Sequence, residues 1–390
     1  MACEQVTLQD VCELIVDCPH TSTKDEGVGY PLIRTPNVGR GRLILTDVHR
    51  VSQDVYERRV SRAVPRQGDL ILAREAPAGN VAIVPPGIEV CLGQRTMLLR
   101  PDSSFVVPEY LNYYLNAPEQ RDRMLRLANG ATVSHINVAD IRNMPVQLPS
   151  RGEQSKVAEL LNVLDDKIDL NNRLNDYLEQ LVDGKFQELF GGLNFNATLS
   201  DVAEITMGQS PAGSSYNEEG AGIIFYQGRG EFGWRFPKRR LYTTEPKRLA
   251  CEGDVLMSVR APVGDLNVAF ENCCIGRGLA AIHSETPSFA LYIMRFLKPQ
   301  LEAYNGEGTV FGSINGKALK SLEVALPSHN EVMQFESFAA PIDALIRSNE
   351  NETRKLNNLR NYLLPKLMSG EIDVSKVDLT QLTNNHLADC

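Results

Sequence analysis

The chain has 390 residues and a net charge of −9, and 43 % of its residues are hydrophobic and 23 % charged, as in ordinary globular proteins. It contains no apolar run of about 18 residues and no basic-then-apolar start, so we expect no membrane-spanning helix, no secretory signal and a cytoplasmic location. Its eight cysteines form no CxxC pair, and a zinc site needs about four clustered ligands, so we expect reduced, mostly buried thiols and no metal site.

Residues 1–150 form the first predicted domain, in which short β-branched runs alternate with glycine and proline. The runs at 71–73, 81–84 and 97–99 are typical of strands, and residues 108–115 are typical of a helix on the flank of a sheet. We therefore predict an α+β domain with a mixed or antiparallel sheet. Its cations are fifteen arginines and one lysine, Lys24. One interpretation of this preference for arginine over lysine is that the domain binds phosphates and guanine edges, which the arginine side chain suits. The other is that the surface of the domain is simply poor in lysine.

Residues 151–192 are predicted to form a long helix. Ser150 is placed to cap its N-terminus, and Glu153 completes a capping box. Apolar residues then recur every three or four positions over about five heptads, and Gly191 and Gly192 end the helix. The apolar positions are Val157, Leu161, Leu164, Ile168, Leu178, Val182 and Leu189.

The same order then repeats, with a second domain at 193–327, a second long helix at 328–370 and a C-terminal tail at 371–390. The run at 255–257 predicts a strand, and residues 288–297 predict a helix. Ser328 and Glu331 form the second capping box, and Ser369 and Gly370 end the helix. We expect Pro365 to kink or shorten this helix, since proline cannot donate a backbone hydrogen bond. The apolar positions are Phe335, Ala339, Ile342, Ile346, Leu356, Leu363 and Leu367.

The two halves of the chain are copies of one ancestral unit. Short matches occur in the same order in both halves, and chance would supply one such match but not an ordered series. The matched segments are Leu8-x-Asp10-Val11 with Leu199-x-Asp201-Val202, Gly68-Asp69-Leu70 with Gly253-Asp254-Val255, Ala76-Pro77-x-Gly79 with Ala261-Pro262-x-Gly264, Cys91-x-Gly93 with Cys274-x-Gly276, Ile136-Asn137 with Ile314-Asn315, and Leu148-Pro149-Ser150 with Leu326-Pro327-Ser328.

The two predicted helices are expected to pair as an antiparallel coiled coil. Each has a polar middle, with Asn171 and Asn175 in the first helix and Asn349 and Thr353 in the second, and buried asparagines fix the register of a coiled coil. These residues would align in either direction, but the chain must return to begin the second helix, which favours the antiparallel pair. The alternative is that each helix packs on its own domain. A helix of roughly 38 residues spans about 57 Å, the length of about 17 base pairs, so the pair could separate two half-sites.

Two loops combine cations, glycine and amide side chains, as expected of a DNA-binding surface. The first covers residues 33–42, and the second covers 226–230 with 234–240. Arginine and glutamine can bond base edges in bidentate fashion, whereas lysine and backbone amides hold phosphates. The DNA-binding candidates in these loops are Arg34, Arg40, Arg42, Gln227, Arg229, Arg235, Lys238, Arg239 and Arg240. The competing interpretation is a solvated charged surface, with Trp234 and Phe236 in the core.

Several motifs are similar to those of the target-recognition domains of type I restriction-modification specificity subunits. They are Val16-Asp17-Cys18-Pro19-His20-Thr21, Pro31-Leu32-Ile33-Arg34, Met257-Ser258-Val259-Arg260-Ala261-Pro262-Val263-Gly264-Asp265, Cys273-Cys274-Ile275-Gly276-Arg277-Gly278-Leu279-Ala280-Ala281 and Lys366-Leu367-Met368-Ser369-Gly370-Glu371-Ile372. The resemblance covers nearly the whole chain and adds Arg74, Arg260 and Arg277 to the DNA-binding candidates. The first copy has Arg74-Glu75-Ala76-Pro77 where the second has Arg260-Ala261-Pro262, which leaves the equivalence of Arg74 and Arg260 open.

The resemblance implies recognition of a bipartite double-stranded DNA target, with one half read by each domain. It implies two methyltransferase subunits and then nuclease/translocase subunits as partners, with S-adenosylmethionine, ATP and Mg bound there and no cofactor in this chain. The sequence has neither an Asn/Asp-Pro-Pro-aromatic motif nor a GxxxxGK[ST] loop, so we expect no catalytic residue. Two rival interpretations stay open: a scaffold or adaptor that spaces two protein partners without DNA, and an enzyme whose site no motif reveals.

Overall fold

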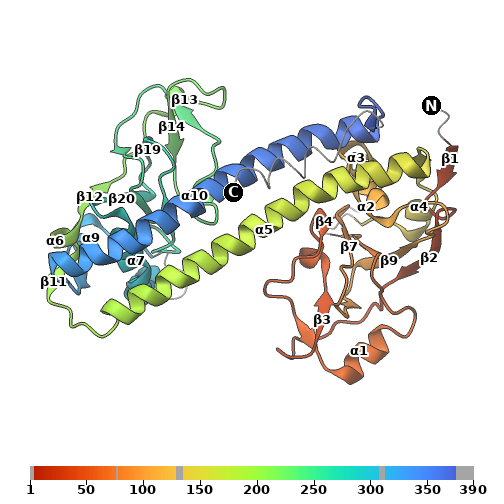
Figure 1. Cartoon of the computed structure of the whole chain (residues 1–390), viewed down its shortest axis with the longest axis horizontal. Helices are drawn as coiled ribbons and strands as arrows, with labels where there is room; N and C mark the ends of the chain where they lie inside the picture. Colours follow the sequence, from red (N-terminus) through yellow and green to blue (C-terminus); the bar gives the residue numbers. More distant parts are fainter. Residues whose placement is uncertain (1–3, 76–77, 129–134, 307–311, 375–390) are drawn as a thin grey trace. The chain divides into compact units, whose positions relative to one another are not determined.

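The computed structural model describes four stretches of the chain, residues 4–75, 78–128, 135–306 and 312–374. The chain divides into two compact units: unit 1 comprises Met1–Leu170 and Thr353–Cys390, and unit 2 comprises Asn171–Glu352. Each unit holds one domain and half of each of two 40-residue helices, α5 (Arg151–Phe190) and α10 (His329–Met368) (Figure 1). The predicted division into five segments stays a prediction, and most of the predicted tail lies outside the described residues.

The domain of unit 1 is built on a mixed five-stranded sheet. Its strands lie in the order β2 (Cys12–Asp17), β9 (Thr96–Pro101), β6 (Leu70–Ala73), β7 (Val81–Ile83) and β4 (Gly41–Arg42), with β4 parallel to β7 and the other pairs antiparallel. A second sheet places β3 (Tyr30–Ile33) between β5 (Arg50–Val51) and β8 (Cys91–Leu92), and β1 (Glu4–Thr7) pairs with β10 (Pro145–Leu148). The domain also contains α1 (Gln53–Arg59), α2 (Pro108–Asn116), α3 (Pro118–Leu127) and α4 (Val138–Arg142).

The domain of unit 2 repeats this plan. One sheet has the order β12 (Glu204–Met207), β20 (Leu279–His283), β17 (Val255–Ser258) and β18 (Leu266–Val268). The other has the order β13 (Tyr216–Asn217), β15 (Tyr242–Thr243), β14 (Ile223–Tyr226), β19 (Cys273–Ile275) and β16 (Leu249–Ala250), and β11 (Ala197–Thr198) pairs with β21 (Glu323–Val324). The domain also contains α6 (Leu199–Val202), α7 (Pro287–Phe296), α8 (Lys298–Glu302) and α9 (Gly316–Lys320).

The predicted α+β fold is confirmed in both units, with mixed sheet pairing in each. The predicted strands fall on β6, β7, β9 and β17, and the predicted helices on α2 and α7. All residues of β6 are buried because the strand lies between two cores: Leu70 and Leu72 contribute to one hydrophobic cluster, and Ile71 and Ala73 to another. Alternate side chains of a strand point to opposite faces, so a sheet covered on both sides needs an uninterrupted apolar run.

Backbone hydrogen bonds identify equivalent positions in the two domains. The matching pairs are Leu8 N–H to Met144 O (2.8 Å) with Leu199 N–H to Leu322 O (2.9 Å), Gly93 N–H to Ile33 O (2.8 Å) with Gly276 N–H to Tyr226 O (2.8 Å), and Ile136 N–H to Arg74 O (3.0 Å) with Ile314 N–H to Val259 O (3.1 Å). The duplication inferred from sequence is therefore present in the backbone, and it allows side chains to be compared position by position.

The two long helices begin as predicted and run antiparallel. The hydroxyls of Ser150 and Ser328 donate to Glu153 and Glu331 at 2.7 Å in each case. Within unit 2, two hydrogen bonds of 2.8 Å join the helices, from Asn171 to Glu352 and from Asn349 to Asn175. The residue numbers of the bonded partners fall along α10 as they rise along α5, so the two helices run in opposite directions. Helix α10 continues past Pro365 to Met368, so the proline does not end it.

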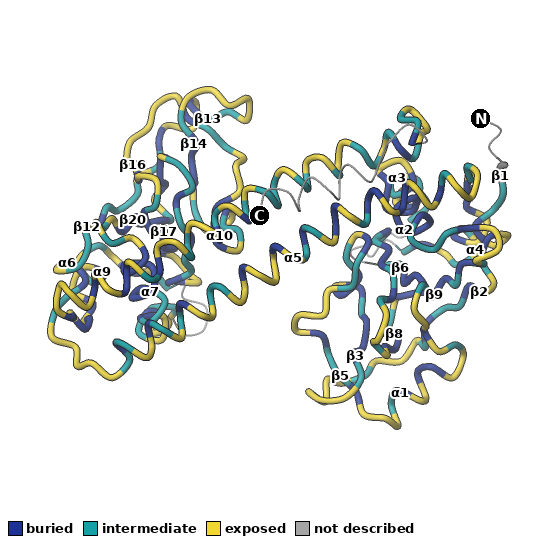
Figure 2. The backbone as a smooth tube through the Cα atoms, viewed as in Figure 1, coloured by how far each residue is buried: buried dark blue, intermediate teal, exposed yellow. Residues whose placement is uncertain are grey.

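Each half-helix also packs into the core of its own domain, so pairing and domain packing are both present rather than alternatives. In unit 2, Phe186 and Phe190 of α5 contact Phe335 of α10 and Phe289 of α7 with ring centroids 5.4 to 5.9 Å apart. In unit 1, Val157 and Leu367 belong to the cluster that contains α2. Buried and exposed residues alternate along both helices (Figure 2). Among the described residues, no helix is both long and apolar enough to cross a membrane.

Candidate nucleic-acid interface

Loops that follow three strands of unit 2 surround a cleft of about 520 Å³, which we call the loop cleft. Gln227 and Arg229 follow β14, Arg260 follows β17, and Arg277 follows β19, so four of the DNA-binding candidates line one cleft. The other lining residues are Ser210, Pro211, Tyr216, Gly228, Ser258, Ala261 and Gly278. The fold thus brings together candidates that are far apart in the sequence.

A close backbone approach at Gly276 sets two of these loops side by side. The Gly276 N–H donates to Tyr226 O at 2.8 Å, and a Cβ on Gly276 would lie 2.6 Å from Gln227 O. Only glycine permits this approach, which makes Arg277 and Gln227 neighbours across the loops. Arg260 is positioned by Val259, whose N–H donates to Gly278 O at 3.0 Å.

The loop cleft presents two cations that form no ion pair with any described residue. Arg260 and Arg277 are exposed, and neither forms an ion pair within the described part of the chain, whereas Arg229 pairs with Asp265. No carboxylate is among the lining residues described for this cleft. Two unpaired guanidinium groups beside the Gln227 amide can bond an acidic or hydrogen-bonding ligand, and they match the donors that read guanine and adenine edges.

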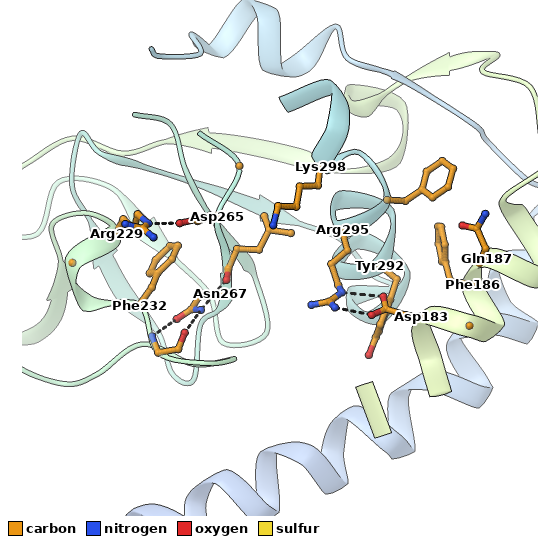
Figure 3. A pocket seen from close by; sticks show the side chains of 16 residues that line it. Asp183, Phe186, Gln187, Arg229, Phe232, Asp265, Asn267, Tyr292, Arg295 and Lys298 are labelled. Atoms are coloured by element: carbon orange, nitrogen blue, oxygen red, sulfur yellow. Dashed lines mark hydrogen bonds and ion pairs between the residues drawn. The ribbon is translucent and has the colours of Figure 1, made fainter. Parts of the chain in front are cut away.

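A larger cavity of about 930 Å³ in the same unit has most of its charges paired. Figure 3 shows Arg229 beside Asp265 and, elsewhere in the cavity, Arg295 beside Asp183. The Arg295 guanidinium donates to both carboxylate oxygens of Asp183, at 2.9 and 2.6 Å. Because these carboxylates neutralise the arginines, this cavity attracts an anion less strongly than the loop cleft does, although it also contains Lys298.

One DNA-binding candidate, Arg235, is corrected by the structure. Its side chain is only 4 % exposed and donates to Glu179 of α5 and Asp343 of α10 at 3.0 Å each, and to Tyr292 of α7 at 3.2 Å. Burial alone would lower the pKa of Arg235, but these neighbours raise it above its ordinary value. Arg235 therefore fastens its loop to both helices and is not presented to a ligand.

The rest of the 234–240 loop is exposed apart from Phe236 and Pro237. Lys238 is exposed, Arg239 pairs with Glu271 at 2.6 Å, and Arg240 pairs with Glu231 at 2.7 Å. These three residues stay predictions as DNA contacts. Phe236 lies in the core as the competing interpretation held, whereas Trp234 is 43 % exposed.

In unit 1 the candidates of the 33–42 loop differ in their surroundings. Arg40 is exposed. Arg34 is half-buried at the start of a short 3-10 turn, and its Cγ would lie 2.7 Å from a Cβ on Gly93. Arg42 pairs with Asp166 at 2.6 Å and with Asp169, both on α5. Arg42 therefore ties its loop to α5 through an exposed ion pair, and all three residues stay predictions as DNA contacts.

The backbone shows that Arg74 is not equivalent to Arg260. Matching hydrogen bonds place Arg74 opposite Val259, so Glu75 occupies the position of Arg260. The Arg74 side chain is 12 % exposed, pairs with Asp17 at 2.6 Å and donates to Ile136 O at 2.9 Å. The Arg74 guanidinium is therefore held by contacts within its own domain, and its role as a DNA contact stays a prediction.

Sequence reasoning named Arg34 but missed Glu75 and Gln94, the two other residues of unit 1 that correspond to residues of the loop cleft. Gly93 corresponds to Gly276, so Arg34 takes the place of Gln227, and Gln94 that of Arg277. Glu75, in the place of Arg260, pairs with Arg95 at 2.7 Å. The matched Cys-x-Gly segments could have revealed Gln94, because it directly follows Gly93 just as Arg277 directly follows Gly276.

One group of side chains has the chemistry of a metal site. Cys251, Asp254 and His283 bring ligand atoms within 4.8 Å of one another. However, Asp254 accepts hydrogen bonds from His283 Nδ1 at 2.7 Å and from the Cys251 N–H at 2.8 Å. In unit 1, Asp69 makes the same contacts with Arg100 and with the Arg66 N–H. An arginine cannot bind a metal, so we interpret both groups as turn-stabilising contacts.

The thiols of the described cysteines are all free. Cys18, Cys91, Cys273 and Cys274 are buried, and burial raises the pKa of Cys91 to about 11. A thiol with a raised pKa carries little of the reactive thiolate at neutral pH. Cys3 and Cys390 lie outside the described residues.

Comparison with known proteins gives one consistent result. The family model for the type I restriction modification DNA specificity domain matches residues 2–180 and 196–361. The chain is 31 % identical to the type I restriction enzyme MjaX specificity subunit of Methanocaldococcus jannaschii, over 94 % of this chain and 93 % of that one. It is 22 % identical to the MjaIX specificity subunit of the same organism, over 85 % of this chain and 84 % of that one. Among solved structures, the S subunit of a type I restriction-modification system from M. genitalium shares the fold, with a TM-score of 0.62, 16 % identity, and coverage of 94 % of this chain and 96 % of that one.

Proposed function

The chain belongs to the family of type I restriction-modification specificity subunits, and from this premise we propose that it selects a bipartite double-stranded DNA target. Each unit would read one half of the target with the loops that follow its strands. No finding supports the rival interpretation of a scaffold that does not bind DNA. The observation that carries the proposal is the loop cleft, where Gln227 lies with Arg260 and Arg277, two exposed arginines that pair with no carboxylate in the described part of the chain.

The chemistry of the loop cleft suits the major groove. Guanine presents two acceptors there, which an arginine fork can bond together, and adenine presents an acceptor and a donor that a glutamine amide can bond. Among the described residues, no carboxylate pairs with Arg260 or Arg277, so no such ion pair has to break before these arginines bind DNA. Arg229 keeps its pair with Asp265, which orients its guanidinium at the edge of the cleft.

We propose that catalysis is left to partner subunits. The candidate interface offers donors for binding, and we assign it no nucleophile or general base. Two methyltransferase subunits would bind S-adenosylmethionine, and nuclease/translocase subunits would bind ATP and Mg. The chain would direct both activities by placing the assembly on its target.

The proposal is tested by mapping methylated sites in a genome that carries the chain with its methyltransferase partners. R260A and R277A should each relax or change bases in one half of the target and leave the other half intact, because the cleft lies wholly in unit 2. Each lost bidentate contact should lower the binding free energy by about 1–3 kcal/mol and relax the preference for one base of the target. R173A, which removes an exposed cation on α5, is the matched control and should change neither half. An unchanged target in both variants would contradict the proposal.

A further inference from the structure

Unit 2 contains a second cleft, of about 650 Å³, whose charges are all positive. It is lined by Arg248, Lys317 and Lys320 together with Thr206, Met207 and Gly316, and we call it the basic cleft. We propose that the basic cleft holds backbone phosphates of the DNA strand whose bases enter the loop cleft. This inference rests on the proposed function, because it assigns a second contact to the same DNA.

The cations of the basic cleft share with Arg260 and Arg277 the lack of an ion pair among the described residues. Arg248, Lys317 and Lys320 are exposed, and none forms an ion pair within the described residues. Elsewhere in unit 2, by contrast, Arg239 and Arg347 pair with nearby carboxylates. No carboxylate is among the residues described as lining the cleft. Three positive charges around one cleft, with no carboxylate among its described lining residues, create a positive electrostatic potential that attracts anions. On DNA, the anions that lysine and arginine side chains bind are the backbone phosphates.

The cleft is open because of a glycine. A Cβ on Gly316 would lie 2.9 Å from Met207 Cγ, so any side chain there would push into the hollow. The equivalent residue of unit 1 is Val138, since Asn137 and Asn315 begin the equivalent helices α4 and α9. Unit 2 therefore has a glycine beside the cleft where the copy in unit 1 has a branched side chain.

The cations are also specific to unit 2. Ala139 of unit 1 stands where unit 2 has Lys317, as matching bonds to Asn143 and Ser321 show. Arg142 stands where unit 2 has Lys320, but its guanidinium donates to Ile15 O at 2.9 Å and so contacts its own sheet. Since both copies share the backbone, these differences are not required by the fold, and the basic cleft is an added feature.

The basic cleft and the loop cleft are joined by shared elements. Strand β12 contributes Thr206 and Met207 to the basic cleft, and the chain that follows it contributes Ser210 and Pro211 to the loop cleft. The backbone carbonyl of Arg248 accepts a hydrogen bond of 2.9 Å from the N–H of Ile275, two residues before Arg277. A nucleotide strand at the loop cleft would therefore continue past the basic cleft. Phosphate contacts fix the position of a protein on the duplex without reading the base sequence. The lysines of the basic cleft fit this role, whereas the arginines and glutamine of the loop cleft fit contacts with bases.

The test measures how the affinity of the full chain for a labelled random-sequence duplex depends on salt. Each phosphate neutralised on a duplex contributes about 0.9 to the slope of log K against log salt. K317A/K320A should therefore reduce the slope by about 1.8 relative to the unaltered chain, and G316V should reduce it without any change in charge. K317R/K320R should keep it. The control K156A/R173A removes two exposed cations of α5 and should leave the slope unchanged.

The outcomes separate this inference from the function it rests on. If the unaltered chain shows no salt-dependent affinity for duplex DNA, the proposed function fails. If it binds with a steep slope that K317A/K320A leaves intact, only the basic-cleft proposal is overturned. A rise in melting temperature with inorganic phosphate, lost in K317A/K320A while the DNA slope stays unchanged, would assign the cleft to free phosphate and also overturn it. Melting curves without phosphate show that each variant is folded.

Discussion

The domains of the two units share a backbone but differ in nearly every charge that their strand-end loops present. At equivalent positions, unit 1 has Arg34, Glu75 and Gln94, and unit 2 has Gln227, Arg260 and Arg277. The buried strands that carry these loops are apolar in both units, with β6 and β17 fully buried. The comparison shows that the core restricts the strands while the loops are free to vary. Two copies of one fold can therefore read different bases.

A second difference lies in how each unit fastens its loops to the long helices. In unit 1, Arg42 reaches α5 through carboxylates at a site where its side chain is 39 % exposed. In unit 2, Arg235 reaches α5 and α10 at a site where its side chain is 4 % exposed. Solvent screens the first contact and not the second, so the same type of contact should differ in energy between the units.

The largest effect is expected where a buried side chain of a long helix packs into the hydrophobic core of its domain. Phe335 and Val157 occupy equivalent positions after the capping boxes and are both buried. F335A should lower the free energy of unfolding by about 3–5 kcal/mol, because it removes a ring that contacts Phe186, Phe190, Phe289 and Tyr292. V157A deletes a smaller side chain and should cost less. Denaturant titration measures both, and equal losses would mean that α10 does not complete an aromatic core.

Next in size is the contrast between the two fastening arginines. R235A leaves the carboxylates of Glu179 and Asp343 without their shared partner and should cost about 3 kcal/mol. R42A breaks an exposed pair and should cost less than about 1 kcal/mol. Chemical denaturation of both variants gives the comparison. A cost for R42A as large as that for R235A would show that exposure does not explain the difference.

A smaller and more specific effect is expected from exchanging one loop residue between the units. E75R places at the unit 1 position the residue that unit 2 has in Arg260. It should change the bases accepted in the half-site read by unit 1 by about 1–3 kcal/mol per altered contact and leave the other half unchanged. Mapping of methylated sites in the assembled system reads out both halves. Changes in both halves would contradict independent reading by two units.

The smallest effect concerns pH. His283 donates to Asp254 where unit 1 has the pair of Arg100 and Asp69, and its hydrogen bond and the charge of Asp254 raise the pKa of His283. A raised pKa in the folded state stabilises the fold below the unfolded pKa of about 6.5, and this contribution is lost as pH rises through the folded value. Because the His283 side chain is 52 % exposed, we expect less than about 1 kcal/mol. H283R should remove this pH dependence of the melting temperature; an unchanged profile would mean that the pair contributes nothing.

The sequence by itself determined the parts of this protein that depend on local pattern. The capping boxes at Ser150 and Ser328, the buried strands and the duplication all follow from spacing and residue type within short segments. The antiparallel direction of the helices followed from the need for the chain to return. The expectation that Pro365 shortens the second helix was wrong, since α10 continues to Met368, and the expected kink stays a prediction.

Only the tertiary structure decided which cations are free to bind a ligand. Arg235 and Arg260 look alike in the sequence, yet Arg235 is enclosed by Glu179 and Asp343, whereas Arg260 is exposed and forms no ion pair with a described residue. The same holds for Arg74, which Asp17 neutralises, and for Lys317, beside which no carboxylate lines the cleft among the described residues. The reason is physical: burial and ion pairing depend on groups far apart in the chain, and local spacing carries no information about their distance in space.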